Sequence, residues 1–238
     1  MDSKLADLLF VMTRHPLTPL PPPAPASAWR AETELPRQVD LAPGVRVTVT
    51  GPAFWETDGP AGGVAFMRAP EHGATDDVHE SLARQALAQF MRGQWPLAAL
   101  RGRYLLVAWN TQARTVRVAN DGFRTYPLHF HATGEGIVCS TDLGLLLRSL
   151  AQPPRVDPVA IYHYLNLTFV PSPSTPFTGV AKLPPDHLLE WPPLRTAAAP
   201  CSPSYTEDLA GDEAERAAQL RERMIAAVTD YRPARGTA

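Results

Sequence analysis

The sequence predicts an α+β domain whose sheets are mostly antiparallel, and two kinds of observation predict it. Short apolar segments with strand character follow one another in pairs across tight turns, as 104–110 does with 115–119 and 128–131 with 137–140. These pairs are interrupted by a few segments whose apolar residues recur at helical spacing, the first of them being 78–92. Hairpins interspersed with a few helices are typical of the α+β class.

The composition is that of a globular chain of 238 residues, with 45% hydrophobic and 19% charged residues. Its net charge of -2 excludes a strongly basic protein that neutralises nucleic-acid phosphates. No apolar run approaches the length of a membrane span. The two cysteines, Cys139 and Cys201, form no C-x-x-C pair and fit a reducing compartment, so we expect a cytoplasmic protein without a zinc site.

Three predicted strands and a proline-rich arm precede the helix of 78–92. Residues 8–13 have the apolar character of a short buried strand. The segment 15–36 is rich in proline and is expected to be an arm that is neither helix nor central strand. Valine alternates with polar residues over 45–49, which predicts a half-buried strand, and a glycine- and proline-rich turn leads to another strand over 63–67.

Two further helices follow the second hairpin. Ser140 or Thr141 is a candidate N-cap for a short helix that carries the leucines of 143–150. Asp157 followed by proline predicts the start of a helix that runs to residue 165, because proline is well tolerated in the first helical turn.

The C-terminal part contains a last strand, a linker and a helix. The strand is expected over 188–191. Asp212 and Glu215 have the spacing of a capping box and predict the start of an amphipathic helix that ends near residue 228.

Several segments resemble a known family. The runs L-R-G-R-Y-x-x-V-A-W-N and V-A-N-D, the latter followed by P-L, are similar to segments of class II glutamine amidotransferases, as is V-C-S-T. The run P-S-P-S-T-P-F-T-G-V-A-K-L-P-P-D-H is similar to a specific motif of asparagine synthetases. These matches lie at residues 100–110, 118–128, 138–141 and 171–187, and the resemblance covers about residues 95–230.

The resemblance implies a fold and a domain organisation. The N-terminal domain of that family is a four-layer αββα sandwich of the N-terminal-nucleophile hydrolase type, expected here over 1–192. Residues 193–211 would be a linker, and 212–238 would be the first helix of a truncated synthetase domain. That domain uses ATP and Mg²⁺ to activate a carboxylate, but its S-G-G-x-D-S pyrophosphate loop does not occur in these 238 residues. We therefore expect no cofactor in this chain.

The resemblance also implies a cysteine nucleophile directly after the initiator methionine, where its own α-amine would act as the base. Asp2 occupies this position, and neither Cys139 nor Cys201 is near it. The family's Asn-Gly-Glu segment is missing as well, and 62–64 (G-G-V) is its nearest remnant. We therefore expect no catalytic residue in this chain.

Asp121 and Asp77 are the candidates that the resemblance offers as remnants of a glutamine-binding site. The alternative interpretation of Asp121 is a carboxylate that caps a turn. Arg124 and Asp186 stand where the family has glycine, and aspartate tolerates the left-handed conformation better than most residues.

Two other groups have a functional and an ordinary interpretation. His129 and His131 share a strand face and could bind metal, but no third ligand has suitable spacing, so we expect ordinary strand histidines and no metal. The segment 182–185 (K-L-P-P) either contacts a ligand or simply fixes the path of the chain into the last strand.

Taken as a whole, the sequence predicts the non-catalytic N-terminal domain of an asparagine-synthetase-like, ATP-dependent amide-forming enzyme. Its expected partner is a synthetase domain in cis or in trans, and a homodimer is an open alternative. No binding to nucleic acid or to a membrane is expected. One alternative is an active glutamine-hydrolysing subunit of an asparagine synthetase, so whether the chain is an enzyme stays undecided. Another is a free-standing binding or regulatory module that acts through the proline-rich arm.

Overall fold

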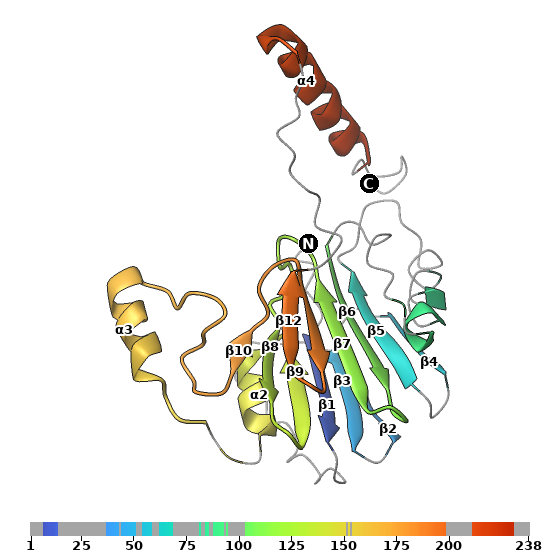
Figure 1. Ribbon diagram of the computed structural model, residues 1–238, viewed down its shortest axis with the longest axis vertical. Helices are drawn as coiled ribbons and strands as arrows, with labels where there is room; N and C mark the ends of the chain where they lie inside the picture. Colours follow the sequence, from blue (N-terminus) through green and yellow to red (C-terminus); the bar gives the residue numbers. More distant parts are fainter. Residues whose placement is uncertain are drawn as a thin grey trace.

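Two antiparallel sheets lie face to face and form the body of the protein (Figure 1). The computed structural model describes residues 7–13, 37–42, 44–50, 54–58, 62–68, 81, 84–85, 88–92, 94, 103–150, 152, 154–198 and 211–230. Asp2, Asp77, Cys201 and the proline-rich arm before residue 37 therefore lie outside the described residues.

The first sheet has six strands, and every neighbouring pair in it is antiparallel. Its spatial order is β10 (Ala181–Lys182), β8 (His129–Ala132), β9 (Gly136–Ser140), β1 (Asp7–Thr13), β3 (Val45–Thr50) and β2 (Arg37–Ala42). The predicted hairpin of β8 and β9 is confirmed, and β1 inserts between β9 and β3 so that the N-terminal strand is central.

The second sheet also has six strands and is antiparallel throughout. Its order is β12 (Arg195–Ala198), β11 (His187–Trp191), β7 (Thr115–Asn120), β6 (Tyr104–Asn110), β5 (Gly62–Arg68) and β4 (Phe54–Asp58). The hairpin of β6 and β7 is confirmed. β6 reads as a continuous apolar run because both of its faces are buried.

The main core lies between the two sheets. Phe10 of β1 and Trp109 of β6 face each other across this core, with ring centroids 5.5 Å apart. Trp191 of β11 belongs to the same core, and its indole N–H donates to the carbonyl oxygen of Thr133 at 3.0 Å. This bond ties the second sheet to the turn between β8 and β9, because buried indole N–H groups need an acceptor.

Helices cover the outer faces of both sheets. α2 (Leu143–Ser149) packs Leu146 against Leu9, Val11 and Val138 on the outer face of the first sheet. Its N-cap is Asp142, which accepts a hydrogen bond from the amide of Leu145; we expected Ser140 or Thr141. Helical residues 88–91 lie against the second sheet, where the guanidinium of Arg117 in β7 lies over the ring of Phe90. The expected four-layer arrangement of helix, sheet, sheet and helix is therefore confirmed.

α3 (Pro158–Leu167) stands away from the sandwich on an arm (Figure 1). It begins where predicted, because Asp157 caps it by accepting from the amide of Val159 and Pro158 is its first residue. It ends at Thr168, whose backbone adopts the left-handed conformation with φ of 63°. Ala160 is its only buried residue.

α4 (Glu213–Asp230) confirms the predicted C-terminal helix. Asp212 accepts from the amide of Glu215, and the carboxylate of Glu215 accepts from the amide of Asp212, so the capping box is formed in both directions. Every large apolar residue of its predicted face is exposed, namely Leu220, Met224 and Val228. No helix in the described part of the chain is long and apolar enough to cross a membrane.

Four strands were not predicted: β2, β4, β10 and β12. β2 and β4 form sheet edges, where one side of the strand has no partner and the apolar alternation is weak. β10 has only two residues. β12 lies in the segment that we expected to be a linker, and all of its residues are exposed. It forms a strand through backbone pairing with β11, which requires no apolar pattern in the side chains.

Candidate functional site

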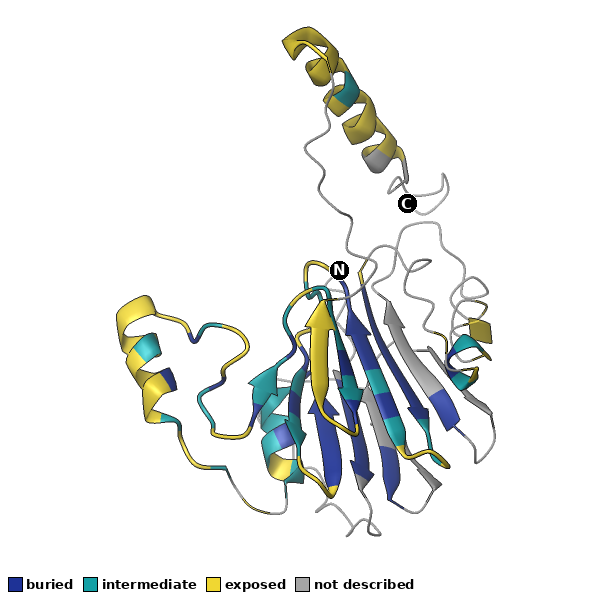
Figure 2. Ribbon diagram, viewed as in Figure 1, coloured by how far each residue is buried: buried dark blue, intermediate teal, exposed yellow. Residues whose placement is uncertain are grey.

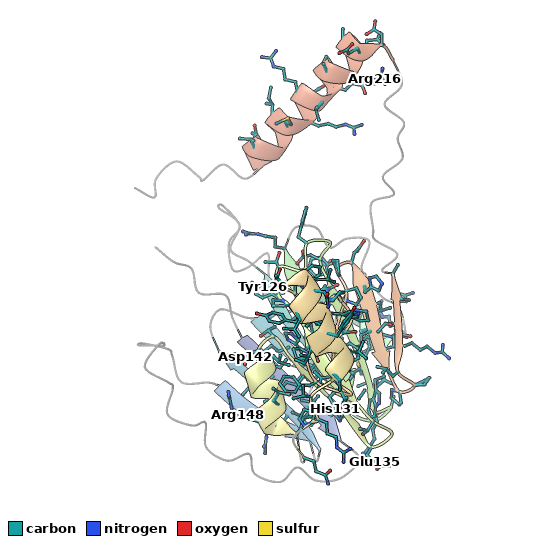
Figure 3. All side chains as sticks on the ribbon, turned by 90° about the vertical axis from the view of Figure 1, so that its left-hand side faces the viewer. Tyr126, His131, Glu135, Asp142, Arg148 and Arg216 are labelled. Atoms are coloured by element: carbon teal, nitrogen blue, oxygen red, sulfur yellow. The ribbon has the colours of Figure 1, made fainter. Side chains whose placement is uncertain are left out.

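The turn that carries Asp121 lies at the end of the sandwich where β6 begins and β7 ends. Figure 3 shows Tyr126, which closes this turn, at one end of the sandwich and Glu135 at the other. The N-terminal residues of β1 are at the Asp121 end, because Leu9 pairs with Ser140 and the amide of Leu8 donates to the Thr141 hydroxyl. β1 therefore begins at this end of the sandwich.

Asp121 is 2% exposed, and both of its carboxylate oxygens accept hydrogen bonds from the protein. One oxygen accepts from the amide of Phe123 at 2.7 Å, and the other accepts from the amides of Tyr104 and Thr125 at 3.1 Å. The Thr125 hydroxyl donates to the carboxylate as well. This geometry favours the interpretation of Asp121 as the residue that caps the turn and fastens it to the start of β6.

Asn120 joins this turn to the segment before β11. Its amide nitrogen donates to the carbonyl oxygen of Pro184 at 2.8 Å, and its side-chain oxygen accepts from the amide of His187 at 3.0 Å. The amide of Asp186 donates to the carbonyl oxygen of Asp121 at 3.1 Å. Sequence analysis did not single out Asn120. Its place inside the V-A-N-D run at 118–121, one of the segments that resemble the family, was the available signal.

The two residues that replace glycine both adopt the conformation that glycine allows. Arg124 has a φ of 50° and Asp186 a φ of 56°. For Asp186 this confirms the prediction that aspartate can keep the turn. Arg124 keeps its turn as well, with its amide donating to the carbonyl oxygen of Asp121 at 3.0 Å. The shape of both loops therefore survives the loss of glycine.

No thiol lies at this end among the described residues. Cys139 sits in the middle of β9, fully buried in the core between the sheets, and burial raises the pKa of its thiol. Gly62 and Gly63 lie in β5 opposite Asn110 and Trp109, at the far end of β6 from Tyr104. Since a strand rises about 3.3 Å per residue, roughly 20 Å separate them from the Asp121 turn along the strand. They are therefore no part of the candidate site.

Two titratable groups beside the turn have shifted pKa values. Burial raises the pKa of the Tyr126 phenol to about 12, while Arg103 opposes this shift. Burial lowers the pKa of His129, and the positive charges of Lys182 and Arg124 lower it further. Both groups are therefore neutral near pH 7.

The two candidate metal histidines lie in β8 but make separate contacts. The Nδ1 atom of His131 is 2.8 Å from the carbonyl oxygen of Gly179. The Nδ1 atom of His129 is buried and has no hydrogen-bond partner. Within the described ranges, no three His, Cys, Asp or Glu residues are arranged to hold a metal ion.

Comparison with known proteins identifies one family. The glutamine amidotransferase domain family matches residues 79–200, which is just over half of the chain. The matched range contains the Asp121 turn, the arm that carries α3, and every strand from β6 to β12. No curated protein matches the chain.

Proposed function

Because the chain belongs to the glutamine amidotransferase domain family, we propose that it is a glutaminase-like domain that has lost catalysis and supports a synthetase domain. The synthetase would be of the asparagine synthetase type and would form an amide bond at the expense of ATP. The motif at 171–187 supports this narrower assignment, because it resembles the corresponding segment of asparagine synthetases.

The chemistry of the site supports the proposed loss of catalysis. Amide hydrolysis in this fold needs a thiol whose proton is taken by the α-amine of the same residue. No cysteine lies in β1 or in the turn of Asp121, and Cys139 is held in a strand within the core, where its own amide is part of the backbone ladder. The carboxylate that the family resemblance offers for glutamine, Asp121, already accepts hydrogen bonds on both oxygens.

The exposed apolar surface of α3 is the observation that carries the supporting role. Apolar residues occur on all sides of this helix, and a helix that is apolar all round is normally buried. The exposed ones on the helix and its flanks are Val156, Val159, Ile161, Tyr162, Tyr164, Leu165, Leu167 and Phe169 (Figure 2). An apolar patch of this kind marks a protein contact surface.

The arm that carries α3 is held by its own hydrogen bonds. Two backbone hydrogen bonds join the two ends of the arm. The amide of Asp157 donates to the carbonyl oxygen of Pro176 at 2.9 Å, and the amide of Thr178 donates to the carbonyl oxygen of Arg155 at 2.8 Å. The Thr175 hydroxyl donates to the carbonyl oxygen of Val180 at 2.8 Å. A helix presented on a fixed stem needs little ordering when it binds, which favours association.

The ATP and Mg²⁺ that the proposed activity uses are assigned to the synthetase domain. The pyrophosphate loop does not occur in the sequence, and the described residues include no cluster of three groups suited to a metal ion. With glutamine hydrolysis lost, the amine would come from free ammonia or from the substrate itself.

A glutaminase assay tests the loss of catalysis. The chain is incubated with glutamine, and ammonia and glutamate are measured; we expect no release above the buffer background. Cys139→Ser and Cys201→Ser variants are the matched controls. Release by the wild-type chain that either variant abolishes would show that a thiol is active and would contradict the proposal.

A binding assay tests the role of α3. Leu165 is 75% exposed, so a Leu165→Glu change is expected to leave the fold intact and to abolish co-purification with a co-expressed synthetase domain. Leu194→Glu is the control, since Leu194 is an exposed leucine of the turn between β11 and β12. Equal co-purification of the wild-type and Leu165→Glu chains would exclude α3 as the contact.

A further inference from the structure

The outer face of the first sheet carries a group of basic side chains at its β10 edge. Strand register places Lys182 of β10 directly opposite His129 of β8, and His129 opposite Ser140 of β9. Directly opposed residues share a face with Cβ atoms about 5 Å apart. Val138 and Val180, two positions from Ser140 and Lys182, belong to the apolar cluster on the outer face, so the row faces outward and away from the main core.

Arg124 joins this row from the turn before β8. The turn of Arg124 lies beside the segment that follows Lys182, because the amides of Arg124 and Asp186 both donate to the carbonyl oxygen of Asp121. The positive charge of Arg124 lowers the pKa of both Lys182 and His129. The left-handed backbone of Arg124 and the hydrogen bond from its amide to Asp121 fix the start of this side chain. We call Arg124, His129 and Lys182 the basic triad.

The positive charges of Arg124 and Lys182 are not paired with carboxylates in the described part of the chain. Neither Arg124 nor Lys182 forms an ion pair there. The carboxylate of Asp142, which acts weakly on His129, is engaged as the N-cap of α2. Asp121, next to Arg124, has both oxygens occupied by its own turn.

Lys182 of the basic triad is fixed by one hydrogen bond and keeps further N–H groups that can donate. The Nζ atom of Lys182 donates to the carbonyl oxygen of Val170 at 2.8 Å, and an ammonium group has further protons to donate. The Nδ1 atom of His129 is buried and unpartnered, and a buried polar atom without a partner costs free energy. A bound anion would stabilise the neighbouring positive charges of Arg124 and Lys182 and would accept hydrogen bonds from their unused N–H groups.

We propose that the basic triad binds a small oxyanion, a carboxylate or a phosphate group, on the outer face of the β8–β10 edge. The anion would accept hydrogen bonds from Arg124 and Lys182 and would lie beside the ring of His129. The site lies outside the space between the two sheets and is independent of the proposed loss of glutaminase activity.

Isothermal titration calorimetry with inorganic phosphate and, separately, with acetate tests this site, with chloride holding the ionic strength constant. We expect saturable binding of at least one anion, and the two titrations identify which. Lys182→Met and Arg124→Asn are expected to weaken it about tenfold, because each removes a charge-assisted hydrogen bond. Arg114→Asn is the matched control, since Arg114 also has a φ of 50° but lies in the turn between β6 and β7.

Two results would overturn the proposal. One is the absence of heat for both anions with the wild-type chain; the other is an equal loss of affinity in Arg114→Asn, which would indicate a general charge effect. If circular dichroism shows that a triad variant does not fold, NMR spectroscopy of the wild-type chain provides a second test. The signals of the His129 ring should then shift saturably as the anion is added, and unchanged signals would refute the site.

Discussion

Replacing Asp121 by alanine is expected to destabilise the protein by about 3 kcal/mol, because the carboxylate holds the turn rather than a ligand. The change removes the acceptor for the amides of Phe123, Thr125 and Tyr104. The Tyr104 amide is buried, and leaving a buried donor without an acceptor costs about 1–3 kcal/mol. The part-buried bonds to Phe123 and Thr125 add about 1 kcal/mol together, since water can replace them in part.

Urea unfolding followed by circular dichroism measures this loss. Asp157→Ala is the matched control, because Asp157 is also a capping carboxylate but accepts one exposed bond, from the amide of Val159. Its loss is expected to cost about 1 kcal/mol. If Asp121→Ala costs no more than Asp157→Ala, the hydrogen bonds to the Asp121 carboxylate do not stabilise the turn and the structural interpretation is refuted.

Three further predictions follow from single residues. The pKa of His129 is lowered, first by burial and then by Lys182 and Arg124, so the folded state resists its protonation. Stability is therefore complete above the unfolded pKa of about 6.5 and falls as the pH decreases below it; urea unfolding at several pH values should show this slope, and a His129→Gln variant should flatten it. In a Cys201→Ser chain, the buried Cys139 should not react with a thiol reagent until the protein unfolds, and rapid labelling of the native state would contradict its placement. Asp186→Val should cost about 1–2 kcal/mol because of the left-handed backbone, whereas Asp186→Gly should be nearly neutral; equal unfolding midpoints for the two variants would argue against a φ of 56°.

The elements that local patterns specify were predictable. In both central hairpins the strands are either continuously apolar or alternate apolar and polar residues, and each turn is only a few residues long. α3 begins at the aspartate and proline that predict it, and α4 begins at its capping box. The edge strands β2, β4 and β12 carried no such pattern, because pairing on one side requires little of the side chains.

The candidate site was predictable only in part. Asp121 was found through its motif, but its hydrogen bond to the amide of Tyr104 joins residues 17 positions apart and depends on the pairing of β6 with β7. Asn120 forms hydrogen bonds with Pro184 and His187, which lie more than sixty positions away, and no local sequence pattern predicts such a contact. The role of Asp77 stays a prediction, since this residue lies outside the described part of the chain.

By itself the sequence determined the hairpins, the helix caps and the kinship with glutamine amidotransferases, since each of these depends on residues close together along the chain. Tertiary structure alone decided which residues meet. Strand register brought Lys182 beside His129, and backbone hydrogen bonds brought the turn of Arg124 beside Asp186. It also decided that α3 stands in solvent with its apolar residues uncovered, because burial depends on what packs against a helix and not on the helix itself.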